Sequence, residues 1–395
     1  MTQPIAELWK LMAETFFVAF IAAVIVTPVA IKVAPKIGAM DIPKDGRRMH
    51  STAMPRFGGI AILAGIIVSL AVFSSKYKLV LAQVALFSGR FIAHMSIMDR
   101  GVFAAVTGCV LIYILGLTDD LRNLRPIVKL AGQIVCATIV FAMGLRVEFI
   151  TNYFGPGNMM FGDVACYIFT VLWLVAITNA VNLIDGLDGL AAGTSAISAL
   201  CIGYVAYIHG QYVPTLAMLA IAGAALGFLP YNFHPAKIFM GDGGSQLLGF
   251  AIAAFSILGT VKSATIVIVV IPALVLGLPI FDTAFAIIRR VLRHQPIGMA
   301  DKEHLHHRIM RAGFGQRRAV MLMYCISGIM GIVAVLYSRG YVVEYLGLTA
   351  VAIMLIYVLM SDTGNRNVSI TASKIKREKD IDPEEPGEKE ISEKK

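Results

Sequence analysis

The chain has 395 residues, of which 57% are hydrophobic and only 15% are charged. Soluble domains carry about 25% charged residues, so this composition excludes an ordinary soluble protein. The formal net charge of +9 is explained by basic loops that lie beside anionic lipid. We therefore expect the protein to bind a lipid bilayer and no nucleic acid.

Apolar runs long enough to cross a bilayer recur along nearly the whole chain, which predicts an all-α, polytopic integral membrane protein with about eleven transmembrane helices. Residues 1–360 would form this transmembrane domain, and residues 361–395, rich in Lys and Glu, predict a disordered cytoplasmic tail. The expected spans are residues 14–34, 57–73, 101–118, 127–144, 164–182, 188–208, 213–230, a segment after Ser245 that ends near 260, 264–288, 320–337 and 341–360.

A strongly basic stretch, residues 41–56, follows the first span. Basic loops tend to stay on the cytoplasmic side of a membrane, so this stretch predicts an N-terminus on the outside. Either the stretch is a topology signal alone, or its arginines, Arg56 among them, also bind phosphates or a lipid headgroup.

The third span ends in two adjacent carboxylates, Asp119 and Asp120, and Lys129 opens the next helix. Adjacent carboxylates repel each other unless a cation lies near them. That cation could be Mg²⁺, Lys129 or a solvent counterion, and solvated loop acids are the common explanation for such a pair.

The central stretch, residues 179–190, carries the amides Asn179 and Asn182 and the carboxylates Asp185 and Asp188. These side chains lie three residues apart, so in one unbroken helix each would be rotated by about 60° from the last. The glycines between them favour a break, with the end of one helix and the start of the next directed at one pocket. The alternative is a polar loop whose Asp and Asn residues only cap helices.

A glycine-rich segment, Gly241 to Ser245, precedes the eighth span. Glycines that open a helix expose backbone N–H groups at the positive end of the helix dipole, which suits phosphate, and Asp242 could bind a divalent cation. The alternative is a helix start that Ser245 caps. The segment is not a P-loop, because the Lys-Ser/Thr ending is absent.

A histidine-rich segment follows the ninth span and contains His304, His306, His307 and Arg308. Three histidines so close together could bind a metal ion. Because many arginines lie nearby, we favour imidazoles that contact a diphosphate. The ninth span itself contains Asp282, for which an ion pair with a following arginine is the simpler interpretation.

Counting the spans from an external N-terminus places every one of these polar clusters on the cytoplasmic face. Chance would scatter them over both faces. A polar site at one face, walled by membrane helices, suits a reaction that joins a water-soluble molecule to a membrane lipid.

In order along residues 40–320, these motifs resemble the signature of the polyprenyl-phosphate N-acetylhexosamine-1-phosphate transferases. The resemblance rests on Asp119-Asp120 with Lys129, Asn179–Leu190, Phe239–Ser245 and His304–Arg308. Within that superfamily, the His-Leu-His-His-Arg form is similar to the enzymes that use undecaprenyl phosphate and N-acetylglucosamine 1-phosphate. These start the synthesis of cell-envelope polysaccharides at the bacterial inner membrane.

The resemblance implies transfer of GlcNAc-1-phosphate from the UDP-N-acetylhexosamine UDP-GlcNAc to undecaprenyl phosphate, with release of UMP and a requirement for Mg²⁺ or Mn²⁺. It implies that Asp242 is a metal ligand, with Asp120 as a second candidate. Asp119 and Asp120 would orient or deprotonate the lipid phosphate.

The resemblance also assigns substrate contacts. Catalytic roles would fall to Lys129, Asp185 and Asp188 besides the two aspartates. Phe239 would stack on uracil. The substrates would be bound by Arg56, Asn179, Asn182, Asp185, Phe239, Gly244, Ser245, His304, His306, His307 and Arg308.

The sequence is compatible with two rival functions. The same chemistry could use another donor, such as UDP-MurNAc-pentapeptide. A transporter could instead use intramembrane acids as ion sites, but it would place acids near the middle of spans, whereas here they cluster at span ends apart from Asp282. A homodimer is compatible with the family, and the sequence predicts no interface for it.

Overall fold

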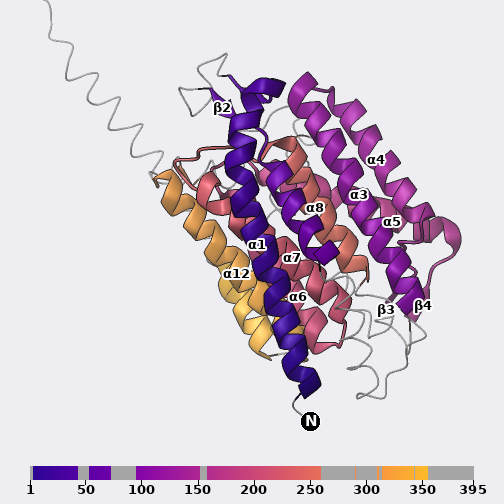
Figure 1. Cartoon of the computed structure of the whole chain (residues 1–395). Coiled ribbons are helices and arrows are strands. Elements are labelled where there is room, and N and C mark those ends of the chain that lie inside the picture. The colour runs from indigo at the N-terminus through magenta and orange to yellow at the C-terminus, as the bar shows by residue number, and fades with distance from the viewer. Residues whose placement is uncertain are drawn as a thin grey trace, which may run out of the picture.

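A computed structural model describes residues 3–42, 53–72, 95–151, 158–258, 290, 309–310, 314–341 and 343–354. In these residues the chain is mostly helical (Figure 1). The helices are α1 (Gln3–Ile37), an unlabelled helix Gly59–Val72, α3 (Met95–Arg122), α4 (Pro126–Ala142), α5 (Asp163–Ile184), α6 (Leu190–Ile208), α7 (Tyr212–Asn232), α8 (Gly241–Leu258), α12 (Gln316–Ser338) and a helix Val343–Met354.

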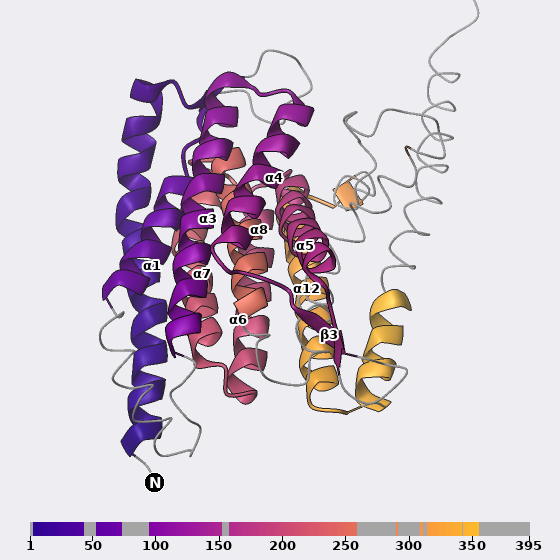
Figure 2. The same ribbon diagram turned by 90° about the vertical axis from the view of Figure 1, so that its right-hand side faces the viewer.

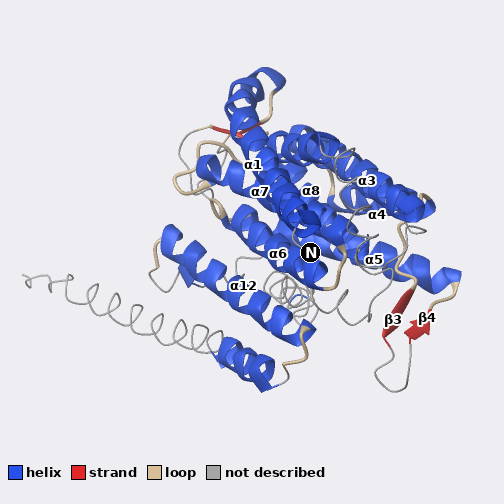
Figure 3. Cartoon of the chain, turned by 60° about the horizontal axis from the view of Figure 1, so that its bottom comes forward, coloured by secondary structure: helices blue, strands red, loops and turns tan. Residues whose placement is uncertain are grey.

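The strands form two short antiparallel hairpins. In the first, β1 (Met40–Asp41) pairs with β2 (Met54–Pro55). In the second, β3 (Phe149–Thr151) pairs with β4 (Asn158–Met160), and Figure 3 shows this hairpin at the side of the bundle away from α12.

The prediction of an all-α membrane protein is confirmed in its coarse form. Six helices within the described residues are long and apolar enough to cross a membrane, namely α1, α3, α5, α6, α7 and α12. Three shorter apolar helices, Gly59–Val72, α4 and Val343–Met354, accompany them. Helices satisfy their own backbone hydrogen bonds, which a bilayer interior requires. The total of eleven spans and the orientation stay predictions, and the span at 264–288 and the tail at 361–395 lie outside the described residues.

The N-terminus lies at the opposite end of the bundle from the first hairpin (Figures 1 and 2). Helix α1 runs between these two ends and packs along α7. Beyond α1, the Ala39 carbonyl accepts a hydrogen bond from the Arg56 backbone N–H, and the Pro55 carbonyl accepts one from Phe239 N–H. The first hairpin therefore fixes Arg56 beside the segment that leads into α8.

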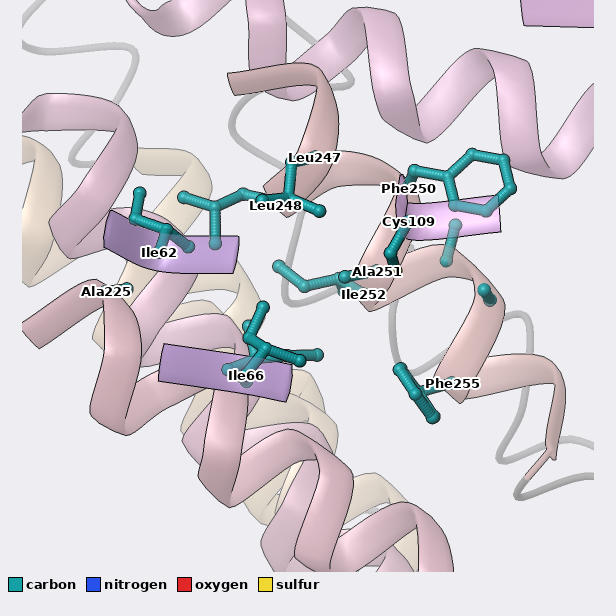
Figure 4. Packing of buried hydrophobic residues seen from close by; sticks show 14 of the residues in the cluster. Ile62, Ile66, Cys109, Ala225, Leu247, Leu248, Phe250, Ala251, Ile252 and Phe255 are labelled. Carbon is teal, nitrogen blue, oxygen red and sulfur yellow. The ribbon is translucent and has the colours of Figure 1, made fainter. Parts of the chain in front are cut away.

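Helix α8 is the centre of the hydrophobic core. Every residue of α8 from Gly243 to Leu258 is buried, and α3, α5, α6 and α7 pack around it. Figure 4 shows how Phe250 and Ile252 of α8 lie among side chains of other helices, such as Ile62, Ile66 and Cys109. Because lipid is as apolar as these side chains, such packing is stabilised mainly by close van der Waals contact.

Glycines allow the helices to approach closely where the polar ends meet. A Cβ added to Gly116 of α3 would lie 2.5 Å from the carbonyl oxygen of Asp242, and one added to Gly59 would lie 2.5 Å from the backbone nitrogen of Gly244. Helix interfaces in membranes commonly use small residues in this way. The carboxyl end of α3 and the first turn of the Gly59–Val72 helix are thus held against the first turn of α8.

Candidate active site

Asp242, in the first turn of α8, is the centre of a polar cluster. One carboxylate oxygen, Oδ2, lies 2.8 Å from Nη2 of Arg56. The other, Oδ1, lies 3.1 Å from Nζ of Lys129 and accepts a hydrogen bond from Nδ2 of Asn182 at 2.6 Å. The cluster therefore joins the β2 end, α4, α5 and α8 at one point.

Asp120 caps the start of α8. Its two oxygens accept hydrogen bonds from the backbone N–H groups of Asp242 at 2.8 Å and Gly243 at 2.9 Å, and Nε of Arg56 lies 2.9 Å from Oδ1. A carboxylate at a helix N-terminus is stabilised by the unpaired N–H groups and by the helix dipole. The expected helix start is confirmed, but Asp120 rather than Ser245 caps it, and these two N–H groups already have an acceptor.

Asp119 is paired with Lys129. Its Oδ2 lies 3.0 Å from Nζ of Lys129, and its Oδ1 accepts a hydrogen bond from the backbone N–H of Leu124 at 2.7 Å. Nζ of Lys129 also donates to Oδ1 of Asn182 at 3.1 Å. The two adjacent aspartates are thus each neutralised by a cation, Lys129 for Asp119 and Arg56 for Asp120.

The central stretch breaks between two helices, as its glycines predict. Helix α5 ends at Ile184 and α6 begins at Leu190, with Gly189 in the left-handed region at φ +80°. Asn182 faces the cluster. Asp188 instead binds the segment between α7 and α8, because its Oδ2 lies 2.8 Å from Nδ1 of His234 and accepts the Ala236 N–H at 3.2 Å.

Asp185 lies in the break and shares the electrostatic field of the cluster. Burial, reinforced by the negative charge of Asp242 and opposed by Arg56, raises the pKa of Asp185 to about 7. Its ordinary value is near 4. Ionisation of Asp185 therefore lowers the free energy of unfolding of the ligand-free protein.

We expect Asp185→Asn to stabilise the ligand-free, metal-free protein. Because the pKa is raised on folding, the cost of ionisation begins above the unfolded pKa and is complete above about pH 7. The gain in Tm over wild type should thus be larger at pH 8 than at pH 5, reaching a few degrees. Thermal unfolding in detergent with EDTA measures it, with Asp163→Asn, an exposed carboxylate at the other end of α5, as the control. Equal gains at both pH values would contradict this assignment.

Other predicted site residues are placed as follows. The Asn179 amide donates to the Gln133 side chain at 2.6 Å. Phe239 is partly buried, and its carbonyl accepts the Gly58 N–H. Gly244 and Ser245 are buried, and Ser245 accepts a hydrogen bond from Nδ2 of Asn182 at 2.8 Å. The segment His304, His306, His307 and Arg308 lies outside the described residues, and so does Asp282.

Three polar residues of this region, Gln133, His234 and Gln246, were absent from the predicted site. Gln133 and Gln246 each follow a predicted site residue, Lys129 and Asp242, by four positions. On a helix that spacing places two side chains on the same face. This spacing was therefore the signal that could have identified the two glutamines.

The donor set fits Mg²⁺. The described part of the chain contains no preformed group of three His, Cys, Asp or Glu side chains for a metal ion. Mg²⁺ commonly needs only one or two carboxylates, with waters and substrate phosphates completing its shell. Within the described residues, the four carboxylates of the cluster, those of Asp119, Asp120, Asp185 and Asp242, face two cationic side chains, Arg56 and Lys129. Carboxylate oxygens of this kind are ligands that a hard divalent cation prefers.

Comparison with known proteins gives consistent results. A family model described as glycosyl transferase family 4 matches residues 102–260. A probable undecaprenyl-phosphate N-acetylglucosaminyl 1-phosphate transferase of Bacillus subtilis is 40% identical over 87% of this chain and 89% of its own length. An undecaprenyl-phosphate alpha-N-acetylglucosaminyl 1-phosphate transferase of Escherichia coli is 29% identical over 84% of this chain and 83% of its own length. A phospho-N-acetylmuramoyl-pentapeptide-transferase of Bacillus subtilis is 29% identical over 81% of this chain and 96% of its own length.

Proposed function

The chain belongs to glycosyl transferase family 4, as a membrane enzyme that transfers a hexosamine phosphate to a polyprenyl phosphate, and from this premise we propose that its donor is UDP-GlcNAc and its acceptor undecaprenyl phosphate. The products are undecaprenyl-diphospho-GlcNAc and UMP. The reaction is the first membrane step of a cell-envelope polysaccharide at the bacterial cytoplasmic membrane.

The observation that carries the proposal is a network of ion pairs. Arg56 pairs with Asp120 and Asp242, and Lys129 pairs with Asp119 and Asp242. In phosphoryl transfer the protein mainly positions the reactants and neutralises their charge. Here two cationic side chains are held in place by three acids on two helices, α3 and α8. Such a network can exchange carboxylate partners for phosphate oxygens without moving the helices.

The reaction proceeds by direct attack. An oxygen of the lipid phosphate forms a bond to the β-phosphorus of UDP-GlcNAc, and the bond between that phosphorus and the oxygen of UMP breaks. A phosphate monoester has its second pKa at about 6, so the acceptor is mostly dianionic at neutral pH. Asp119 and Asp120 therefore act chiefly by positioning Lys129 and Arg56, which bind the acceptor and the diphosphate.

Asp242 would hold a Mg²⁺ ion, for which Mn²⁺ can substitute, with Asp120 as a second candidate ligand. When bound, the ion neutralises negative charge that develops on the diphosphate. Asn182, Asp185 and Asp188 would position the nucleotide and the sugar phosphate, and Phe239 would stack on uracil. The histidines of residues 304–307 and Arg308 would contact phosphate oxygens.

GlcNAc is favoured as the sugar by two observations. The relative with 40% identity over 87% of this chain is described by the GlcNAc reaction, and the histidine-rich segment reads His-Leu-His-His-Arg. The rival donor is UDP-MurNAc-pentapeptide, because a relative described by that reaction is 29% identical over 81% of the chain. The two donors predict the same UMP product and the same metal requirement.

We expect purified protein to release UMP from UDP-GlcNAc when undecaprenyl phosphate and Mg²⁺ are present, and not from UDP-MurNAc-pentapeptide. A panel of UDP-sugars, assayed with and without EDTA, measures both the donor and the metal requirement. Release from a different donor alone would keep the reaction class and overturn GlcNAc. Folded protein that releases no UMP with any donor would overturn the proposed function.

A further inference from the structure

A second polar layer lies in the helix bundle beneath the Asp242 cluster. It consists of three amides, Gln133 of α4, Asn179 of α5 and Gln246 of α8. Nδ2 of Asn179 donates to Oε1 of Gln133 at 2.6 Å, and Nε2 of Gln133 donates to Oε1 of Gln246 at 3.0 Å. Gln133 is 1% exposed and Gln246 is 0% exposed, whereas Asn179 is partly buried, so two of the three amides are enclosed by protein.

The amide layer repeats the connections of the Asp242 cluster one helical turn deeper. Gln133 follows Lys129 by four residues, Gln246 follows Asp242 by four, and Asn179 precedes Asn182 by three. Residues at these spacings share a helix face. The same three helices, α4, α5 and α8, are therefore joined twice, first by Lys129, Asn182 and Asp242 and then by the three amides.

One hydrogen-bond donor of the amide layer is unpaired among the described residues. The second hydrogen of the Asn179 amide binds the Val175 carbonyl at 2.8 Å, whereas Nε2 of Gln246 has no partner among the described residues. A buried unpaired donor costs about 1–3 kcal/mol. Stability alone does not explain three amides here, because apolar side chains would carry no such cost.

What the amides supply is register. Apolar contacts between membrane helices tolerate sliding and rotation, whereas a buried polar contact fixes one alignment, as a single buried Asn does in coiled coils. Lys129 must reach Asp119, Asp242 and Asn182 at once, at 3.0 to 3.1 Å. A small displacement of α4 along α8 would break that arrangement.

We propose that Gln133, Asn179 and Gln246 form a positioning layer that sets the register of α4, α5 and α8 and thereby holds Lys129 and Asn182 on Asp242. This inference rests on the proposed function, in which Lys129 and Asp242 belong to the active site. Gln133 and Gln246 are buried below the Asp242 cluster and act through the residues one turn above them.

Gln133→Leu and Gln246→Met test the proposal, because each removes amide contacts at nearly constant volume. The expected result is a loss of about 10- to 100-fold in kcat, since small misplacements of reacting groups cost that much, while KM for each substrate changes less than about threefold. The matched control is Ser256→Ala, which removes the hydrogen bond from Nε1 of Trp173 that joins α5 to α8 elsewhere. It should lower Tm by a similar amount and leave kcat within about twofold.

A double-mutant cycle separates positioning from general destabilisation. If Gln133 acts through Lys129, Gln133→Leu should cost almost nothing further in kcat when it is added to Lys129→Met. Losses that multiply instead, or a Gln133→Leu variant with wild-type kcat, would overturn the positioning layer while the UMP activity of wild type upholds the proposed function.

A structure of Gln133→Leu gives a readout that needs no activity. The distance between Nζ of Lys129 and Oδ1 of Asp242, 3.1 Å in the native chain, should lengthen beyond hydrogen-bonding range. An unchanged distance would overturn the inference even if wild type proved to catalyse another reaction or none. The Lys129–Asp242 distance in the variant thus tests the positioning role, whereas UMP release by wild type tests the proposed function.

Discussion

The Asp242→Asn variant is expected to fold and to release UMP at least about a thousandfold more slowly than wild type, a loss typical of removing a charged group or metal ligand from a preorganised site. The substitution preserves size and shape. It removes the charge that Arg56 and Lys129 share at 2.8 and 3.1 Å. Initial rates with saturating UDP-GlcNAc, undecaprenyl phosphate and Mg²⁺ measure the effect.

The control for this variant is Asp163→Asn, which removes an exposed carboxylate in the first turn of α5, away from the cluster. Its rate should match wild type. Titration with Mg²⁺ adds a second criterion, because loss of a ligand should raise the Mg²⁺ concentration that gives half-maximal rate. An Asp242→Asn variant that keeps its rate within about tenfold and its Mg²⁺ response unchanged would remove Asp242 from the centre of the site.

The Gly116→Ala variant is expected to lose about 1–3 kcal/mol of stability, as overpacked cores do, and to lose at least about tenfold in activity. A Cβ at this position would lie 2.5 Å from the Asp242 carbonyl oxygen and 2.6 Å from the Cα of Gly243. Both atoms belong to the backbone, so α3 and α8 must move apart. Asp120 would then be drawn away from the N–H groups that it caps.

Gly328→Ala in α12 is the matched control, because a Cβ there meets no atom of the described residues within 4 Å. It should keep its activity, and its Tm should equal or exceed that of wild type, since Ala favours helices over Gly. Thermal unfolding and UMP release are measured on the same preparations. If Gly116→Ala behaves like Gly328→Ala, then close contact between α3 and α8 is not needed for the site.

The sequence predicts the helices well because an apolar run in a bilayer has few alternatives to a helix. The break after Ile184 was also readable, since Gly186 and Gly189 follow the carboxylates and Gly189 adopts φ +80°. Helix ends were less accurate. Helix α1 covers Gln3–Ile37 rather than residues 14–34, because polar residues such as Lys10 continue the helix on an exposed face.

The partners of the site residues could not be predicted from spacing. Asp120 accepts hydrogen bonds from N–H groups more than a hundred residues later, at Asp242 and Gly243, and Gln133 reaches Gln246 across 113 positions. Such pairings depend on which helices are neighbours, and hydrophobic periodicity does not specify neighbours. Only the span count indicated that these residues share one end of the bundle.

The burial of α8 has a consequence for how the protein is made. Its first turn carries Asp242 and little apolar surface, so this segment alone gains less from contact with lipid than its neighbours do. In the described part of the chain, the helices that enclose it, α3, α5, α6 and α7, all precede it in sequence. Ribosomal synthesis therefore produces these four helices before α8. The side chains of Arg56, Lys129 and Asn182, which contact Asp242, are also made before it.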